Sequence, residues 1–290
     1  MSLLYDDSLP GESAVRGRPA VPVRPTVPVV LVHAFPVHRG LWADVRACLA
    51  AGAGAGAGAD AGAADGAAGP ALRLLTPDLP GFGASARSAA VPSLDVYVDA
   101  LVAMFDALSL ERVVLGGVSM GGYVSLAFAS RHPGRLLGLV LADTKASADP
   151  VAALENRLRI ASVLESEGTA RVLVEESLPQ LLGATTKTGR PHVVDAVRAM
   201  VATVDPLAAA WAQRAMAARG DTFDVLRSLA VPVTVIVGDE DGITPTSDAA
   251  AMVAATSRAT LTVIPGSGHL SAIEDPAAFA AALTAFAATL

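Results

Sequence analysis

Ser119 stands between two glycines, in the string Gly117-x-Ser119-x-Gly121, directly after an apolar run over 113–118. A run compatible with a helix follows from Tyr123. This strand–turn–helix context is the one in which a serine nucleophile is held on a sharp, strained turn. A side chain in place of either glycine would collide with the neighbouring strand or helix. The same string also occurs in ordinary glycine-rich turns, so a catalytic serine requires partners elsewhere in the chain.

A serine nucleophile needs a base, and the base needs an acid that orients it. His269 lies in the turn 265–270 after the last apolar run, and Asp241 lies in the turn 238–245 after the run before it. In sheets of parallel strands, ligands gather at the carboxyl ends of the strands, so these turns are expected to meet the serine at one edge. We therefore expect Ser119, Asp241 and His269 to form a catalytic triad.

The choice of acid stays open at this point, because Asp239 and Glu240 lie in the same turn as Asp241. The spacing to Pro245 favours Asp241. His33 also lies just beyond a predicted strand, and we expect it to brace the turn that follows rather than to act as a base.

No cofactor is expected. The five histidines are scattered without the spacing of metal ligands. The string Gly81-x-Gly83-x-x-Ala86 follows a strand and fits a relaxed dinucleotide-binding pattern, but Pro92 separates it from the next helix. That turn therefore does not open a helix able to receive a pyrophosphate. No Lys-Ser or Lys-Thr pair follows the glycines at 121–122, which excludes a P-loop there.

Strands and helices alternate along most of the chain, and this alternation must position the candidate residues. It predicts an α/β fold, with a mostly parallel sheet, right-handed crossovers and helices on both faces. The expected strands cover 27–32, 72–76, 112–118, 136–142, 231–237 and 259–264, and the expected helices cover 41–50, 94–108, 123–132, 247–255 and 275–290.

The stretch 143–230 interrupts the alternation. It holds helical patterns over 151–167, 169–178, 192–203 and 207–219, and no convincing strand. Because it is inserted between two strands, we expect a helical cap over the carboxyl edge of the sheet. The core would then comprise 27–142 and 231–290.

Two further segments carry no chemistry. Residues 1–26 are rich in Pro, Gly and Arg, and we expect a mobile tail or a weak edge hairpin. Residues 51–69 consist almost entirely of Ala and Gly, which predicts a disordered loop because glycine disfavours a helix and no bulky side chain is present.

Composition bounds the class of protein. The chain has 290 residues, 52% of them hydrophobic, which is enough for one large domain with an insertion. Its net charge of -7 argues against nucleic acid and anionic membranes as partners. The single cysteine, the absence of a basic and apolar leader at the N-terminus and the lack of a long apolar run indicate a soluble cytoplasmic protein. Nothing in the composition indicates an oligomeric state.

With these residues placed, the chain resembles the α/β-hydrolase superfamily over about 27–290. The elbow at 117–122, Asp241 with Thr244-Pro245 behind it and Gly268-His269 match the family's catalytic motifs in order. His33-Ala34-Phe35-Pro36 resembles the family's oxyanion turn, and 78–85 resembles its structural turn after the next strand. Within the superfamily, the chain is similar to small esterases and 3-oxoadipate enol-lactonases. Ala34 replaces the glycine that many members carry, and the usual N-terminal hairpin is poorly visible.

The resemblance implies a role for each residue. Ser119 would attack an acyl carbon, His269 would take and return its proton, and Asp241 would orient the imidazole. The backbone N–H groups of Phe35 and Met120 would form the oxyanion hole. His33 and Trp42 are further candidates for the pocket wall.

The main hypothesis for function is hydrolysis of a carboxylic ester or lactone through an acyl-enzyme intermediate. The same triad also supports cofactor-free perhydrolase or haloperoxidase-like activity, or hydrolysis of a C–C bond. A non-catalytic receptor for a small ligand on the same fold is an alternative of a different class. The substrate itself is left open, because the predicted cap carries no chemical signature.

Overall fold

The apolar runs form the strands of a single sheet in the computed structural model, which describes residues 3–8, 26–55 and 71–290. Within those residues the sheet has seven strands in the order β1-β3-β2-β4-β5-β6-β7. All neighbouring strands are parallel except β1, which pairs antiparallel with β3 at one edge. The strands are β1 (Tyr5–Asp7), β2 (Thr26–Val32), β3 (Ala71–Pro77), β4 (Val113–Val118), β5 (Leu136–Ala142), β6 (Val233–Gly238) and β7 (Ala259–Ile264). The predicted α/β fold is confirmed.

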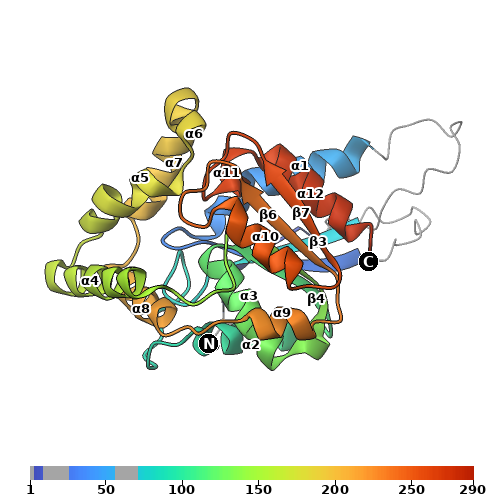
Figure 1. Cartoon of the computed structure of the whole chain (residues 1–290), viewed down its shortest axis with the longest axis horizontal. Coiled ribbons are helices and arrows are strands. Elements are labelled where there is room, and N and C mark those ends of the chain that lie inside the picture. Colours follow the sequence, from blue (N-terminus) through green and yellow to red (C-terminus); the bar gives the residue numbers. More distant parts are fainter. Residues whose placement is uncertain (1–2, 9–25, 56–70) are drawn as a thin grey trace, which may run out of the picture.

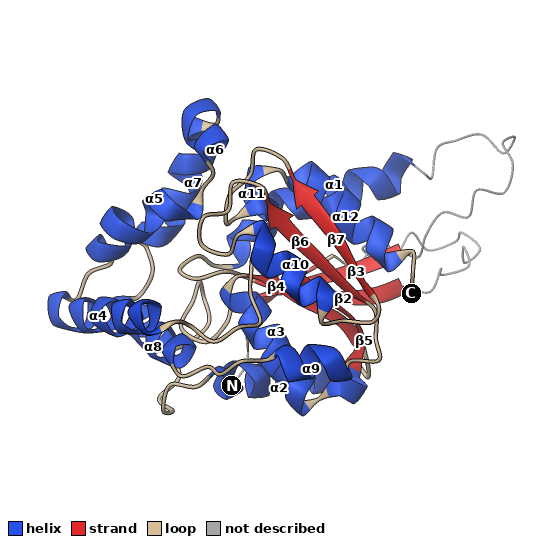
Figure 2. Cartoon of the chain, in the orientation of Figure 1, coloured by secondary structure: helices blue, strands red, loops and turns tan. Residues whose placement is uncertain are grey.

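Helices cover both faces of the sheet, as predicted (Figure 1, Figure 2). On one face, Trp42 packs against Phe279 with ring centroids 5.5 Å apart. On the other, Phe105 packs against Phe128 at 5.4 Å. The first layer comprises a 3₁₀ helix (Arg39–Trp42), α1 (Ala43–Ala55), α11 (Ser271–Glu274) and α12 (Pro276–Ala287), and the second comprises α2 (Leu94–Ala107), α3 (Met120–Arg131) with a 3₁₀ turn (Pro133–Arg135), α9 (Phe223–Ser228) and α10 (Thr246–Ala254).

A set of helices projects beyond the carboxyl ends of the strands and forms the cap (Figure 1). Residues 143–230 are all described and contain no strand, as expected. The cap comprises α4 (Val151–Glu167), a π-helical turn (Leu173–Ser177), α5 (Leu178–Leu181), α6 (Ala184–Gly189), α7 (Pro191–Ala202) and α8 (Pro206–Ala217). The cap ends earlier in the chain than the expected residue 230, because α9 buries Leu226 and contacts the core helix α3.

Two predictions about the ends of elements need correction. Helix α1 continues through Ala55, so residues 51–55 are helical rather than part of a loop. Alanine has the highest helix propensity, so the alanines of this segment offset the helix stability that the interspersed glycines cost. Strand β1 pairs with β3, whereas the expected edge hairpin would pair within 1–26. The remaining parts of these two predictions, at 9–25 and 56–69, lie outside the described residues.

Within the described ranges, no helix combines the length and the hydrophobicity needed to cross a bilayer.

Candidate active site

Ser119 occupies a strained turn between β4 and α3. Its backbone has φ 55 and ψ -113, a conformation that non-glycine residues rarely adopt. A Cβ at Gly117 would lie 2.5 Å from the carbonyl oxygen of Val32, and a Cβ at Gly121 would lie 2.2 Å from the same oxygen. The predicted steric need for both glycines is confirmed.

The three candidate catalytic side chains form a hydrogen-bonded chain. The hydroxyl Oγ of Ser119 lies 2.8 Å from Nε2 of His269. The other ring nitrogen of His269, Nδ1, lies 2.9 Å from Oδ2 of Asp241. Asp241 and His269 are buried, and Ser119 keeps 8% of its surface exposed. The geometry brings together a hydroxyl, an imidazole and a carboxylate from three strand ends, the groups that a nucleophile, a base and an orienting acid require.

Asp241 is the acid that contacts the histidine. Its Oδ1 accepts hydrogen bonds from the backbone N–H groups of Ile243 and Thr244, at 2.8 and 2.9 Å. The Thr244 hydroxyl donates to Oδ2 at 2.8 Å. The alternatives point elsewhere: Asp239 accepts from the backbone of Gly266, and Glu240 accepts from Thr185.

Burial disfavours the charged forms of Asp241 and His269, and the contact between the two side chains outweighs this effect of burial. Burial alone would raise the pKa of Asp241, but the charge and hydrogen bond of His269, with those from Thr244, hold the pKa below its ordinary value. Burial alone would lower the pKa of His269, but the charge and hydrogen bond of Asp241 raise it above its ordinary value. The pair therefore favours an imidazolium next to a carboxylate, the charge state that forms when the base accepts a proton.

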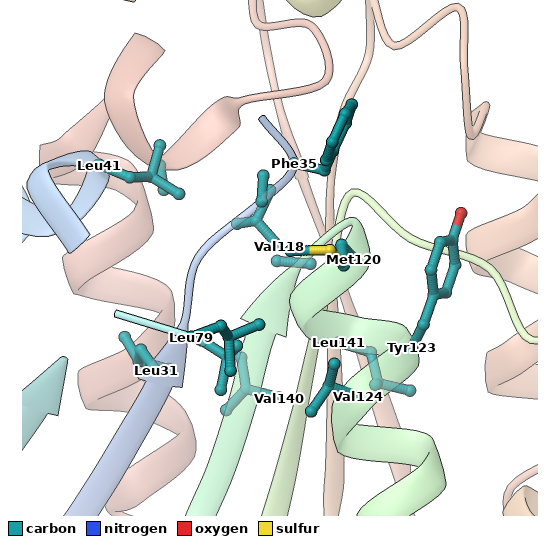
Figure 3. Packing of buried hydrophobic residues seen from close by; sticks show 14 of the residues in the cluster. Leu31, Phe35, Leu41, Leu79, Val118, Met120, Tyr123, Val124, Val140 and Leu141 are labelled. Atoms are coloured by element: carbon teal, nitrogen blue, oxygen red, sulfur yellow. The ribbon is translucent and has the colours of Figure 1, made fainter. Parts of the chain in front are cut away.

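The predicted oxyanion turn lies against the elbow. Figure 3 places Phe35 beside Met120, just beyond Val118 at the end of β4. Within the described ranges, the backbone N–H groups of Phe35 and Met120 donate to no protein acceptor. Met120 is the first residue of α3, where backbone N–H groups and the helix dipole favour a negative charge.

His33 and Trp42 do not line an accessible pocket. Both are fully buried. His33 accepts a hydrogen bond from the backbone N–H of Leu79 at 3.0 Å, and its Nδ1 lies 2.9 Å from the carbonyl oxygen of Ala34. Burial lowers the pKa of His33 to about 4, so the ring is neutral and braces the turn, as expected. Trp42 packs into the helix layer against Phe279, which makes its assignment to the pocket wall wrong.

The sequence pattern of the alpha/beta hydrolase family matches residues 29–282. The chain belongs to this family. It is 32% identical to 2-hydroxymuconate semialdehyde hydrolase of Pseudomonas sp. (strain CF600) over 230 residues, which cover 74% of this chain and 76% of that protein. Its fold is similar to that of a thermophilic esterase from Thermogutta terrifontis, solved with malate bound (33% identity, TM-score 0.81, 97% of this chain and 91% of that one). The enol-lactonase of Burkholderia xenovorans LB400 shares the fold at 22% identity (TM-score 0.79, 98% and 95% coverage).

Sequence reasoning missed a second buried carboxylate in this hydrolase. Asp143 directly follows β5, and its carboxylate accepts from the backbone N–H of Gly238 at 3.1 Å and from Ser271, through its N–H at 2.9 Å and its hydroxyl at 2.7 Å. It thus joins the turn of Asp241 to the turn of His269. Burial, with the nearby charge of Asp241, raises the pKa of Asp143 to about 7. The rule that polar residues gather at strand ends would have found it.

The cap of the hydrolase carries a half-buried cluster of charges near the elbow. Three cations, Lys145, Arg157 and Arg219, surround the single carboxylate of Asp149, at 2.6 to 3.0 Å. Burial would raise the pKa of Asp149, but these cations lower it to about 2, so the cluster holds an excess of positive charge. The guanidinium of Arg219 also lies 4.0 Å from the ring centroid of Tyr123, in the first turns of α3.

A cavity of about 510 Å³ lies beside the oxyanion turn. Its wall on the core side includes Pro36 and Val37, which directly follow Phe35, and its wall on the cap side includes Met200 and Val204. Its lining does not include Ser119, Asp241 or His269.

Proposed function

We propose that this hydrolase cleaves a carboxylic ester or a lactone through an acyl-enzyme intermediate. The observation that carries the proposal is the chain of hydrogen bonds from Ser119 through His269 to Asp241, at 2.8 and 2.9 Å. It supplies a nucleophile within reach of a base, and a base whose tautomer is set by a buried acid.

The first half of the reaction forms the acyl-enzyme. Ser119 Oγ attacks the carbonyl carbon while its proton moves to Nε2 of His269, and the carbonyl oxygen becomes an oxyanion. The N–H groups of Phe35 and Met120 stabilise this charge. The bond to the leaving oxygen then breaks, and His269 delivers the proton to that oxygen. For a lactone, the alcohol so formed remains part of the same molecule.

The second half releases the acid. A water molecule gives its proton to His269 and adds to the acyl carbon, and the second oxyanion forms in the same place. The bond to Ser119 Oγ breaks, and His269 returns the proton to the serine. Asp241 stays ionised throughout, which agrees with the direction of its pKa.

Ser119→Ala tests the proposal directly. The purified wild-type protein is expected to hydrolyse p-nitrophenyl acetate and to be labelled at Ser119 by a fluorophosphonate. The variant is expected to lose about 10³-fold or more in kcat/KM with an unchanged circular dichroism spectrum, because the triad acts as a unit. A variant that keeps a tenth of the activity contradicts the proposal. Wild-type protein without turnover supports a ligand receptor instead.

The excess positive charge around Asp149 favours a substrate that carries a carboxylate. A panel of neutral esters and carboxylate-bearing lactones tests this step. A higher kcat/KM for the acid-bearing lactones supports an enol-lactonase-like substrate, and equal values support a general esterase.

Hydrolysis of a C–C bond is the second candidate. It is favoured by the 32% identity to 2-hydroxymuconate semialdehyde hydrolase. The compound in that name contains no ester, so its hydrolysis must break a different bond. Assays with 2-hydroxymuconate semialdehyde beside p-nitrophenyl acetate distinguish the two activities. Turnover of the semialdehyde at a kcat/KM well above that of the ester supports the second candidate.

A further inference from the structure

The loop that carries His269 is held by one buried carboxylate. Glu274, in α11, is 3% exposed. Its Oε1 accepts hydrogen bonds from the backbone N–H groups of Gly268 at 2.8 Å and Leu270 at 3.3 Å, the two residues that flank His269. Within the described residues, no salt bridge reaches this carboxylate, so these N–H groups and the one described next compensate for its burial.

The second oxygen of the same carboxylate holds the cap. Oε2 of Glu274 accepts from the backbone N–H of Gly183 at 2.9 Å. Gly183 begins the cap segment 183–190, which contains α6 and approaches the region of α11 in Figure 1. A single side chain therefore joins the backbone on both sides of His269 to the backbone of the cap.

Two further side chains hold the segment 183–190 to the catalytic turns. Arg190 donates from its guanidinium to the carbonyl oxygens of Gly266 and Glu274, on either side of His269 in the chain. Thr185 donates its N–H and its hydroxyl to the carboxylate of Glu240, at 2.8 and 2.5 Å. Glu240 precedes the triad acid, so the cap segment contacts both the turn of the base and the turn of the acid.

The backbones at this junction lie too close for side chains. A Cβ at Gly268 would lie 2.3 Å from the backbone nitrogen of Gly183. A Cβ at Gly183 would lie 2.9 Å from the nitrogen of Gly268 and 2.4 Å from Oε2 of Glu240. The cap segment and the turn of His269 thus move together or must separate, since their backbones approach each other directly at these two glycines.

We propose that Glu274 is a positioning residue for His269, and that it couples the position of this base to the cap segment 183–190. The inference rests on the proposed function. The cap therefore acts on the chemical step as well as on the choice of substrate: a displacement of the segment shifts the backbone of the base. The reacting groups must be held closely, because a shift of about 1 Å costs about 100-fold in rate.

The test is Glu274→Gln, assayed with p-nitrophenyl acetate. The amide would turn its NH₂ group toward one of the N–H donors, so one side of the junction is lost while size is kept. We expect kcat to fall about 10- to 100-fold with little change in KM, because the acetyl group is too small to require the cap. Labelling of Ser119 by the fluorophosphonate should slow by a similar factor. The matched control is Lys187→Ala, an exposed position of the same segment whose ammonium group donates to the carbonyl oxygen of Pro179.

Glu274→Gln with wild-type kcat and labelling rate overturns the inference, as does a change confined to KM. Gly183→Ala is the second variant, which forces the junction apart from the cap side and leaves Glu274 intact; it decides the question if Glu274→Gln does not fold. It should lower kcat for the same ester, and unchanged kcat contradicts the coupling. These results stay distinct from failure of the proposed function, in which the wild-type protein itself neither turns over the ester nor reacts at Ser119.

Discussion

At the scale of single residues, three acids compete for one role, and their contacts separate them. Asp241 lies 2.9 Å from His269, whereas Asp239 and Glu240 bond to Gly266 and Thr185. We expect Asp241→Asn to lower kcat/KM about 10³-fold or more, because the imidazole loses the partner that sets its tautomer. Asp239→Asn should stay within a few-fold of wild type.

The comparison uses one ester substrate and circular dichroism spectra of the variants. Glu240→Gln should have an intermediate effect, since Glu240 acts through the cap segment. If Asp239→Asn or Glu240→Gln loses as much activity as Asp241→Asn, the assignment of the acid is wrong.

The pH dependence of activity follows from the surroundings of His269. The base must be neutral to accept the proton of Ser119, and Asp241 and Asp143 raise its pKa above 6.5, against burial and the charge of Arg157. Activity should therefore fall as the pH drops through a midpoint above 6.5. The measurement is kcat/KM from about pH 5 to about pH 9, and a midpoint at or below 6.5 contradicts the expectation.

Asp143→Asn provides the matched test of that cause. Asp143, whose pKa is about 7, is partly ionised near the acid midpoint and in that form raises the pKa of His269, so removing its charge should move the midpoint modestly to lower pH. Asp224→Asn changes an exposed acid on α9 and should leave the midpoint in place. An unchanged midpoint in Asp143→Asn would show that this carboxylate does not act on the base through its charge.

The strand-end rule predicted that Ser119, Asp241 and His269 would meet at one edge of the sheet, but it did not predict the residues that hold their turns. Ser119 directly follows an apolar run, Asp241 and His269 lie in the turns that follow two others, and a parallel sheet brings such positions to one edge. The carboxylate of Glu274 accepts from the backbone N–H of Gly183, across 91 positions of sequence. No local pattern records such a contact, because it depends on how the cap sits on the core. Trp42 was misplaced for a similar reason: its partner Phe279 comes from the other end of the chain.

At the scale of elements, two glycines in helices have opposite roles. Gly121 lies in α3, where a Cβ would meet the carbonyl oxygen of Val32 at 2.2 Å. Gly52 lies in α1, where a Cβ would meet no atom of the described residues within 4 Å. We expect Gly121→Ala to destabilise the protein by about 2 kcal/mol or more, since backbone must move. Gly52→Ala should stabilise it by up to about 1 kcal/mol.

Urea unfolding of both variants measures the two effects with the same substitution. Gly121→Ala should also lower activity beyond its loss of stability, because Val32 leads into the oxyanion turn. Equal free energies of unfolding for the two variants would contradict the close approach of α3 to β2.

The presence or absence of a local capping residue explains which helix boundaries were predictable. Helix α2 begins where expected, because Ser93 caps it and accepts from the N–H of Asp95 at 3.2 Å, a signal that is local in the sequence. The end of α1 carries no such signal, so the alternation of Ala and Gly suggested a loop where the helix continues through Ala55. Local caps can be read from sequence, but an uncapped helix end depends on small differences in propensity.

At the scale of the whole molecule, the cap and the core each hold one of the two tryptophans of the chain. Trp42 lies in the core against Phe279. Trp211 lies in α8 of the cap, where its ring centroid is 5.1 Å from that of Tyr97 in α2 and its Nε1 donates to the carbonyl of Ala90 at 2.8 Å. The cap is therefore anchored to the core at Trp211 as well as at the segment 183–190.

Two anchors of this kind predict that the cap and the core unfold together. The Trp42→Phe variant keeps Trp211, so its fluorescence reports on the cap, and the Trp211→Phe variant keeps Trp42, so its fluorescence reports on the core. In urea, the fluorescence of each variant should change at the same concentration as the far-ultraviolet circular dichroism of that variant. The two unfolding transitions are compared within the same variant, so the stability lost by removing either ring does not enter the comparison. If the signal of Trp211 changes at a lower urea concentration than the circular dichroism, the cap unfolds on its own. The contacts of Glu274 would then be too weak to join it to the base.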